Sequence, residues 1–318
     1  PAVADLFGRY YQILSNEEPN VPLFLAGLHH LALTGDAPSL APFFPSCDGN
    51  LAPSSALGAA AEGAVADNRD TLLDYMLSTE LQPHVVERSA AVALGALAAA
   101  GQFGGGVSLV EVGCGGGLNL RFDRYAYAFG GRLVGNSPLT LEVASDGAVP
   151  VGALPAVVGR YGLDPAPRNP ADLGDRLLLE SFFAPDAVEQ VEHLRTASGI
   201  LAAEGPLDIR TGTAEDDLLP LLQEAYAAMP EGNTLLLVST FVWPYLSERQ
   251  KEQAVWAIQR QAARLTAQKP MAWLQLEPMA GGLAELKLHT FGWTDQEDRT
   301  VRRLAETDPF VRQIRWLG

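Results

Sequence analysis

The sequence is poor in cysteine and in basic residues, and each shortage excludes a class of protein. Its 318 residues include only two cysteines, Cys47 and Cys114, which are too few for a disulfide scaffold and fit a reducing compartment. Lysine and arginine together number 22 against 38 aspartates and glutamates, so the formal net charge is −16. An acidic surface repels phosphate backbones, and no run of basic residues offsets that repulsion. The composition therefore predicts no nucleic-acid partner.

Metal-ligand patterns and long apolar runs are also missing. The five histidines are not spaced from either cysteine as metal ligands are, so no metal site is predicted. Residues 89–110 carry no charge but consist mostly of alanine and glycine, whereas a membrane-spanning helix needs about 20 strongly apolar residues. Asp5 and Arg9 interrupt the first ten residues, which show no signal peptide. We therefore expect no membrane association and a cytoplasmic protein.

What is present is enough apolar sequence for a large core, organised differently in two parts of the chain. Hydrophobic residues make up 47% of the chain, which rules out a disordered protein. Up to residue 103 the apolar residues recur at helical spacing, which predicts an all-helical N-terminal domain at 1–103. The expected helices of this domain span residues 4–14, 22–33, 63–77 and 83–100.

From Gly104 onward, short apolar runs alternate with amphipathic segments. Such alternation is typical of a parallel sheet with helices on both faces, so residues 104–318 are predicted to form an α/β domain. Helices are expected at 185–203, 215–228 and 247–268. Seven strands are expected, at 107–113, 156–163, 206–210, 234–240, 271–277, 285–291 and 311–316.

The strongest chemical signal is the glycine-rich segment EVGCGGGLNL, which begins at Glu111 and directly follows a predicted strand. Gly113, Gly115 and Gly117 alternate, and a backbone without Cβ atoms can approach a bound cofactor closely. A dinucleotide-binding loop needs a glycine where this chain has Leu118. Glu111 would repel a pyrophosphate and hold a cationic amino-acid group instead. A dinucleotide loop and a glycine-rich turn without a ligand are the alternatives.

This E-x-G-x-G-x-G pattern resembles the first motif of class I S-adenosylmethionine-dependent methyltransferases. The resemblance implies a Rossmann-like, methyltransferase-type sheet of seven strands, with the last strand antiparallel and inserted beside the fifth. It implies S-adenosylmethionine as the cofactor, bound by Glu111, Gly113, Gly115 and Gly117.

The whole chain also resembles an uncharacterised bacterial family with a helical N-terminal half and a methyltransferase-like C-terminal half. The segments that carry this resemblance are LQPHVVERSAAV, EVGCGGGLNLRFDRYAY, GRYGLDPAP and GTAEDDLLPLL. Within the loop the match includes Asn119, which the resemblance adds to the cofactor-binding residues. His84 and Val85 depart from the family's usual amide and acid, so any role of those two groups does not carry over.

Two further parts of a cofactor site follow from the methyltransferase resemblance. An acid at the end of the second strand should bind the ribose hydroxyls; Glu142 lies nearest the usual spacing, about 20 residues past the loop, whereas the family resemblance favours Asp164 and makes 126–150 an inserted hairpin. An acid after the third strand should contact the adenine amine, which suggests Glu215 or Asp216. Thr213 followed by Asp216 equally fits a helix cap.

Asp123 and Tyr125 are the candidate catalytic residues. They follow the loop, on what we expect to be the first helix, near the edge of the sheet where an acid and a phenol can orient or deprotonate a substrate. A salt bridge and a packing tyrosine would explain the same residues.

Two functions remain open on the sequence. The first is an S-adenosylmethionine-dependent methyltransferase that acts on a small-molecule substrate, with the helical domain shaping the acceptor pocket. The second is a non-catalytic relative that binds a ligand or a partner. Residues 242–245 read V-W-P-Y and lack the polar residue and first proline of the (N/D)-P-P-(Y/F) signature, which disfavours methylation of nucleobases or glutamine. The sequence predicts neither the acceptor nor the oligomeric state.

Overall fold

The computed structural model describes residues 1–14, 20–292 and 299–318. The chain divides into two compact units, each assembled from two stretches of sequence. Residues 1–84 and 169–198 form the first, called here the helical unit, and residues 85–168 and 199–318 form the second, called the sheet unit. This division differs from the expected boundary at residue 103, because the helix that ends there packs against the sheet and because residues 169–198 join the helical unit.

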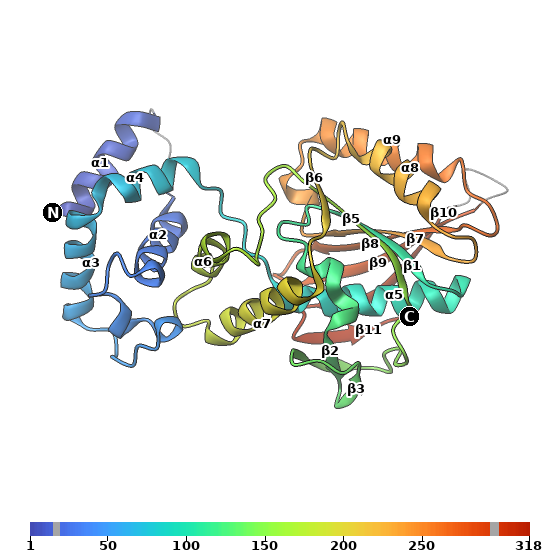
Figure 1. Cartoon of the computed structure of the whole chain (residues 1–318), viewed down its shortest axis with the longest axis horizontal. Coiled ribbons are helices and arrows are strands. Elements are labelled where there is room, and N and C mark those ends of the chain that lie inside the picture. Colours follow the sequence, from blue (N-terminus) through green and yellow to red (C-terminus); the bar gives the residue numbers. More distant parts are fainter. Residues whose placement is uncertain (15–19, 293–298) are drawn as a thin grey trace. The chain divides into compact units, whose positions relative to one another are not determined.

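The helical unit is built around an apolar core to which its first four helices contribute. Asn20 caps the second helix by accepting a hydrogen bond from the Leu23 amide at 3.1 Å, and Gly35 ends that helix in the left-handed conformation. Its elements are α1 (Ala2–Leu14), α2 (Val21–Thr34), η1 (Ala41–Phe43), η2 (Pro45–Cys47), α3 (Ser55–Asp67), α4 (Arg69–Ser78), α6 (Leu173–Ser181) and the first part of α7 (Val188–Glu204) (Figure 1).

Two features of this unit differ from the sequence-based expectation. The helix expected at 63–77 is two helices, α3 and α4, that meet at Asn68, whose backbone leaves the helical region. Helix α6 was not predicted, although Asp172 caps it by accepting hydrogen bonds from the amides of Gly174 and Asp175.

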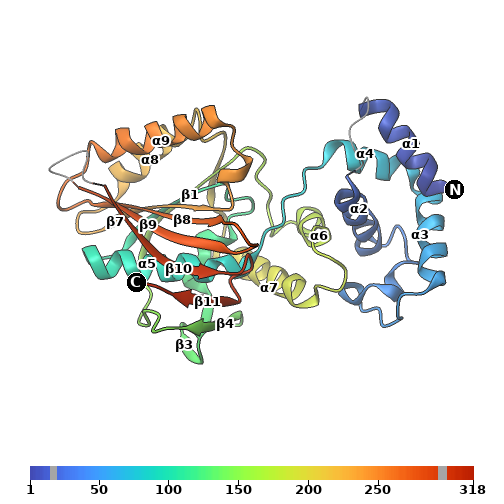
Figure 2. The same ribbon diagram turned by 180° about the vertical axis from the view of Figure 1, so that it is seen from behind.

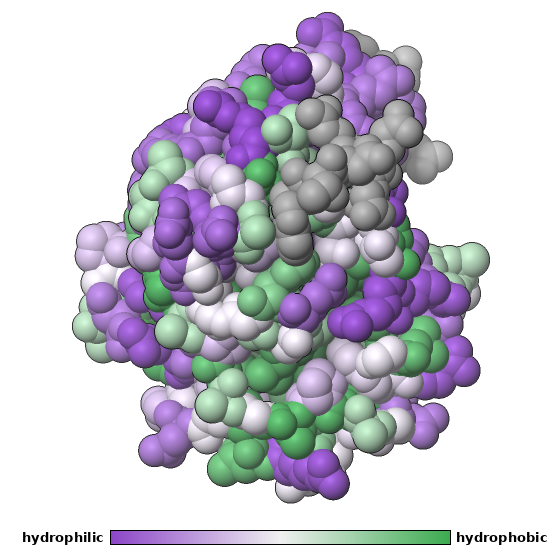
Figure 3. Space-filling model, turned by 90° about the vertical axis from the view of Figure 1, so that its right-hand side faces the viewer, coloured by the Kyte–Doolittle hydropathy of each residue, from purple (hydrophilic) through white to green (hydrophobic). Residues whose placement is uncertain are grey.

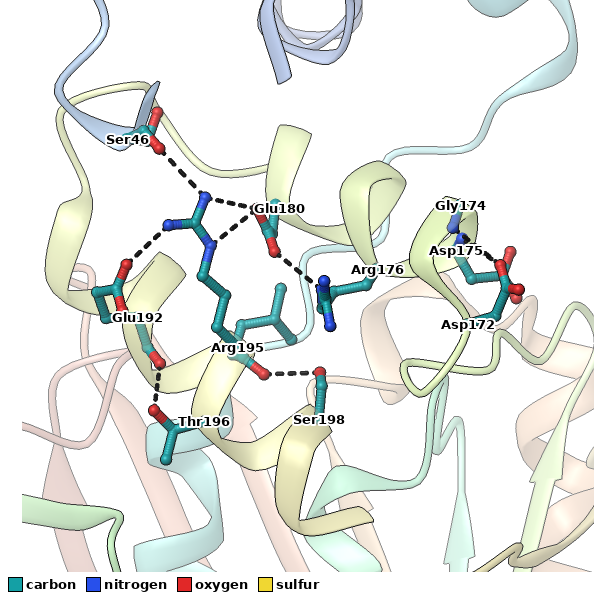
Figure 4. Close-up of polar contacts among 11 residues, drawn as sticks. Ser46, Asp172, Gly174, Asp175, Arg176, Glu180, Glu192, Arg195, Thr196 and Ser198 are labelled. Atoms are coloured by element: carbon teal, nitrogen blue, oxygen red, sulfur yellow. Dashed lines mark hydrogen bonds and ion pairs between the residues drawn. The ribbon is translucent and has the colours of Figure 1, made fainter. Parts of the chain in front are cut away.

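A buried carboxylate organises the polar interior of the helical unit (Figure 4). The Glu180 side chain is only 1% exposed, and one of its oxygens lies 2.9 Å from Nη2 of Arg195 while the other lies 3.4 Å from Nε of Arg176. Arg195 also donates to the backbone oxygen of Ser46 at 3.1 Å and pairs with Glu192 at 2.7 Å. Both oxygens of the buried carboxylate therefore have cationic partners, as structural buried charges require.

The sheet unit contains a sheet of 11 strands among the described residues, in the order β3-β2-β4-β11-β10-β9-β8-β7-β1-β5-β6 (Figures 1 and 2). Its strands are β1 (Val107–Val112), β2 (Ala126–Phe129), β3 (Arg132–Val134), β4 (Thr140–Asp146), β5 (Val157–Asp164), β6 (Asp208–Thr211), β7 (Thr234–Thr240), β8 (Met271–Pro278), β9 (Ala284–Phe291), β10 (Arg299–Thr307) and β11 (Gln313–Trp316). Its helices are η3 (Val86–Arg88), α5 (Ser89–Phe103), η4 (Leu118–Arg124), α8 (Leu218–Ala228), η5 (Trp243–Tyr245) and α9 (Glu248–Ala262), with the end of α7.

The prediction of seven strands was wrong. A strand lies in each predicted segment, but β2, β3, β4 and β10 extend the sheet further. The last strand, β11, pairs with β10 and β4 rather than inserting beside the fifth predicted strand, β8, whose antiparallel neighbour is the next strand in the chain, β9. The segment expected to be an inserted hairpin at 126–150 contains the β2–β3 hairpin and then β4, which pairs with β2 in parallel.

The parallel part of the sheet has a defined topology. Strands β6, β5, β1, β7 and β8 are parallel neighbours, and in chain order this arrangement reads 3-2-1-4-5, as in doubly wound α/β proteins. The order of strands reverses between β1 and β7. In such sheets ligands bind outside the carboxyl ends of the strands at this reversal, which directs attention to the segments that follow β1 and β7.

Helices cover both faces of the parallel strands. Helix α5 lies on one face, where Gly95 permits close packing: a Cβ atom at this position would lie 2.3 Å from a methyl group of Leu274. Helices α8 and α9 cover the opposite face over an apolar cluster. Ser247 and Gln250 form a capping box that starts α9, whose outer side is largely hydrophilic (Figure 3). Among the described residues, no helix is both long enough and apolar enough to cross a membrane.

Candidate ligand-binding site

The glycine loop leaves the carboxyl end of β1 and crosses to the neighbouring strand. The amide of Gly113 donates to the Leu163 carbonyl of β5 at 2.8 Å, and Gly113, Gly115 and Gly117 all have positive φ angles between 52° and 72°. Side chains with a Cβ atom rarely adopt this conformation, so the glycines determine the path of the loop. The helix expected after the loop is the short 3-10 segment η4, because Arg121 takes non-helical backbone angles.

Beneath this loop lies a buried pair of polar side chains with unused hydrogen-bonding capacity. Glu111 is 1% exposed and Asn119 is 4% exposed. The Asn119 amide donates to Oε1 of Glu111 at 2.9 Å, but Oε2 of Glu111 and Oδ1 of Asn119 have no hydrogen-bond partner among the described residues. Burial is the main reason that the pKa of Glu111 is raised to about 8. The pair can therefore accept hydrogen bonds from a ligand that carries donors.

Asp164, the last residue of β5, is brought to the same loop. Its Oδ2 accepts a hydrogen bond from the Gly115 amide at 2.8 Å, and its Oδ1 accepts one from the Ala166 amide at 2.9 Å. Glu142, the alternative acid, is exposed on β4 and belongs to the distant end of the sheet. Of the two candidates, the structure places only Asp164 at the glycine loop.

The acids expected to contact adenine lie between β6 and α8. Glu215 pairs with Arg249 at 2.6 Å, and the amide of Asp216 donates to the Thr213 hydroxyl at 3.2 Å. Helix α8 begins two residues after Asp216, with Asp217 as its N-cap. The Thr213–Asp216 contact therefore lies in the turn before α8, whose N-cap is Asp217 rather than Thr213, and a role of Glu215 or Asp216 in binding adenine stays a prediction.

Asp123 and Tyr125 both have internal partners. Arg160 forms a two-pronged ion pair with Asp123, at 2.8 Å and 2.7 Å, and also donates to the Leu120 carbonyl. The Tyr125 hydroxyl donates to the Leu118 carbonyl at 2.8 Å, and burial raises its pKa above the ordinary range. These contacts fit the alternative of a salt bridge and a packing tyrosine, and the catalytic assignment stays a prediction.

The sequence did not predict a second group of polar residues at this edge of the sheet. Glu277 lies near the end of β8, and its two oxygens accept hydrogen bonds from the amides of Val242 and Trp243, which follow β7. The residue before them, Phe241, has a positive φ of 56°, a strained conformation for a bulky residue, and the Arg88 guanidinium lies 3.9 Å above its ring. The only signal in the sequence was the position of Glu277 at a strand end.

No metal centre accompanies these groups in the described stretches, which contain no cluster of three histidine, cysteine, aspartate or glutamate side chains suited to hold an ion.

The fold and the loop define a doubly wound α/β protein whose candidate ligand site lies at the carboxyl edge of its parallel strands. The chain belongs to a family described as uncharacterised proteins conserved in bacteria, DUF2332, whose sequence model matches residues 2–316. This match confirms the resemblance to an uncharacterised bacterial family. No curated protein and no solved structure matched the chain.

Proposed function

We propose that the protein is an S-adenosylmethionine-dependent methyltransferase that acts on a small-molecule acceptor. The observation that carries the proposal is the pair of buried oxygens, Glu111 Oε2 and Asn119 Oδ1, that lack donors beneath the glycine loop. Adenosylmethionine has an ammonium group with three donors, which complements acceptors of this kind. The pyrophosphate of a dinucleotide would supply no donor to these oxygens, and its negative charge would oppose the ionisation of Glu111.

Asp164 supports the same ligand. Each of its carboxylate oxygens already accepts one backbone hydrogen bond, and each has a second lone pair for a ligand hydroxyl. Two oxygens with one free lone pair each suit the neighbouring hydroxyls of a ribose. Asp164 would thus hold the ribose while Glu111 and Asn119 hold the amino-acid end, with the loop backbone between them.

The chemistry requires little from the protein beyond alignment. A sulfonium methyl group reacts with a nucleophile held in line with it, so positioning supplies much of the rate enhancement. The net charge of −16 supports a small acceptor rather than a nucleic acid. The missing polar residue in the V-W-P-Y segment at 242–245 favours a second candidate, a non-catalytic protein that binds the same ligand without transferring its methyl group.

A thermal-shift comparison tests the proposal. Adenosylmethionine, adenosylhomocysteine and NAD are added at matched concentrations, because a ligand at 100 times its dissociation constant stabilises the folded state by about 2.7 kcal/mol. We expect the two adenosyl ligands to raise the melting temperature by a few degrees and NAD to leave it unchanged. A shift with NAD alone, or with none of the three, would contradict the proposal. Binding without methyl transfer to any acceptor would favour the non-catalytic candidate.

A further inference from the structure

A pocket of about 380 Å³ opens at the carboxyl end of β8 in the sheet unit. In the β8–β9 register Gln275 faces Lys287 and Glu277 faces Glu285, so these four side chains share one face of the hairpin. Trp243 and Lys251, from η5 and α9, complete the wall. The pocket therefore combines one flat aromatic surface with carboxyl and ammonium groups.

The position of Glu277 connects this pocket to the glycine loop. Its oxygens accept hydrogen bonds from the Val242 amide at 3.4 Å and the Trp243 amide at 3.3 Å. Val242 in turn contacts the loop, because a Cβ atom at Gly113 would lie 2.5 Å from one of its methyl groups. Val242 thus contacts both the first glycine of the loop and Glu277.

The surroundings of Glu277 suit proton transfer. Burial raises its pKa to about 7, against the lowering effects of the backbone donors and of Arg88. A carboxyl that titrates near neutrality can accept a proton from a substrate and release it again. The charged groups that face it are Lys251 from α9, Glu285 and Lys287 from β9, and Arg88 from η3.

The lysines define the other end of the pocket. Lys251 pairs with Glu248 at 2.7 Å, and Lys287 pairs with Glu285. The Glu248 side chain is 86% exposed, so a ligand anion can replace it at Lys251 with little loss. An anionic group is therefore accommodated at the lysines while a flat ring contacts Trp243.

Building on the proposed methyl transfer, we propose that this pocket is the acceptor site, that it takes a planar molecule with an anionic end and a hydroxyl or amino group, and that Glu277 accepts the proton of that group. In the reaction the oxygen or nitrogen forms a bond to the methyl carbon. The bond between that carbon and the sulfonium sulfur breaks, and its electron pair stays on sulfur as a thioether. The proton of the acceptor goes to the carboxylate of Glu277.

Probe binding, followed by tryptophan fluorescence at about pH 8, tests the pocket without requiring turnover. The probes are 4-hydroxybenzoate, which carries an anionic end and a hydroxyl, and benzoate, which lacks the hydroxyl. We expect saturable quenching by both probes and loss of the signal in Trp243→Phe. Glu277→Gln should weaken 4-hydroxybenzoate about tenfold and leave benzoate unchanged, because hydrogen bonds to charged groups are stronger than those to neutral ones.

Glu224→Gln is the control. Glu224 lies on α8 outside the pocket, where its carboxylate pairs with Arg210, so neither probe should change in affinity. Absence of saturable quenching, or equal affinities in wild type and Glu277→Gln, would overturn the inference.

A thermal shift with adenosylhomocysteine on the same samples separates this inference from the proposed function. A shift without probe binding leaves the proposed function standing and overturns the acceptor site. Probe binding without a shift overturns methyl transfer and, with it, the assignment of the pocket to an acceptor.

Discussion

Glu180 in the helical unit and Glu111 in the sheet unit are both 1% exposed, yet their surroundings are opposite. Glu180 has an arginine at each oxygen, Arg195 at 2.9 Å and Arg176 at 3.4 Å. Glu111 has one amide partner, an oxygen without any partner among the described residues, and a pKa raised to about 8 by burial.

On the proposed function, the difference separates a structural carboxylate from one that binds a ligand. A buried charge with complete pairing holds its surroundings together, and its loss leaves the partner cations without a counter-charge. A buried acceptor without a donor costs stability, and native proteins keep few of them. Since Glu111 lies under a glycine loop at the strand-order reversal, we attribute its incomplete pairing to ligand binding.

The largest expected effect comes from the loop itself. Gly115→Val should abolish adenosylhomocysteine binding, because Gly115 has a φ of 52° and donates its amide to Asp164, and a β-branched residue disfavours that conformation. Gly131→Val is the matched control, since Gly131 has a φ of 81° in the β2–β3 hairpin with no neighbouring atoms within 4 Å of an added Cβ. Calorimetric titration should detect binding in the control alone. Equal affinity in both variants would contradict the assignment of the loop.

The second-largest expected effect is the loss of stability when the paired carboxylate of Glu180 is removed. Glu180→Gln should lower the free energy of unfolding by about 3 kcal/mol, because it deprives Arg195 and Arg176 of their buried counter-charge. Glu192→Gln removes an exposed partner of the same Arg195 and should cost less than about 1 kcal/mol. Urea denaturation compares the two variants. A similar loss of unfolding free energy in both variants would contradict the claim that the buried ion pairs of Glu180 stabilise the protein more than the exposed pair of Glu192.

The incompletely paired carboxylate of Glu111 should make the free energy of unfolding depend on pH. A carboxyl whose pKa is raised on folding stabilises the folded state below its unfolded pKa, and this contribution is lost as pH rises through its folded pKa. Stability should therefore fall by about 1.4 kcal/mol per pH unit for each such group between about pH 5 and 6.5, with Glu277 contributing up to about pH 7 and Glu111 up to about pH 8. Glu111→Gln should make the decline shallower, as measured by urea denaturation across this range. An unchanged slope would show that Glu111 is ionised in the folded protein.

The sequence was sufficient for the parallel strands and the glycine loop, because buried strands read as continuous apolar runs and a turn with three positive φ angles requires glycine. It was insufficient for β10, whose sequence RTVRRLAET has five exposed residues at its start and therefore lacks an apolar run. The prediction of a helix after the loop failed for a different reason: Arg121 takes non-helical backbone angles, and the segment forms a short 3-10 helix.

The residues of the candidate site likewise differ in whether the sequence predicts them. Glu111 and Asn119 follow the pattern of the loop, so their proximity could be expected from a strand and the turn that follows it. Glu277 could not be found, since its importance depends on Val242 and Arg88, which approach it from distant parts of the chain. Asp123 was predicted to be catalytic from its position after the loop, whereas its partner Arg160 lies on β5.

The most direct test of whether Glu111 binds the ligand is the number of protons released when adenosylhomocysteine binds at pH 7. Calorimetry in buffers with different ionisation enthalpies measures this number. We expect release of close to one proton by the wild type, because the ligand ammonium stabilises ionised Glu111. Glu111→Gln should release almost none and bind the ligand about 100-fold more weakly. A binding heat that does not depend on the buffer, or equal affinity in the two proteins, would contradict the claim that Glu111 is the ligand's partner.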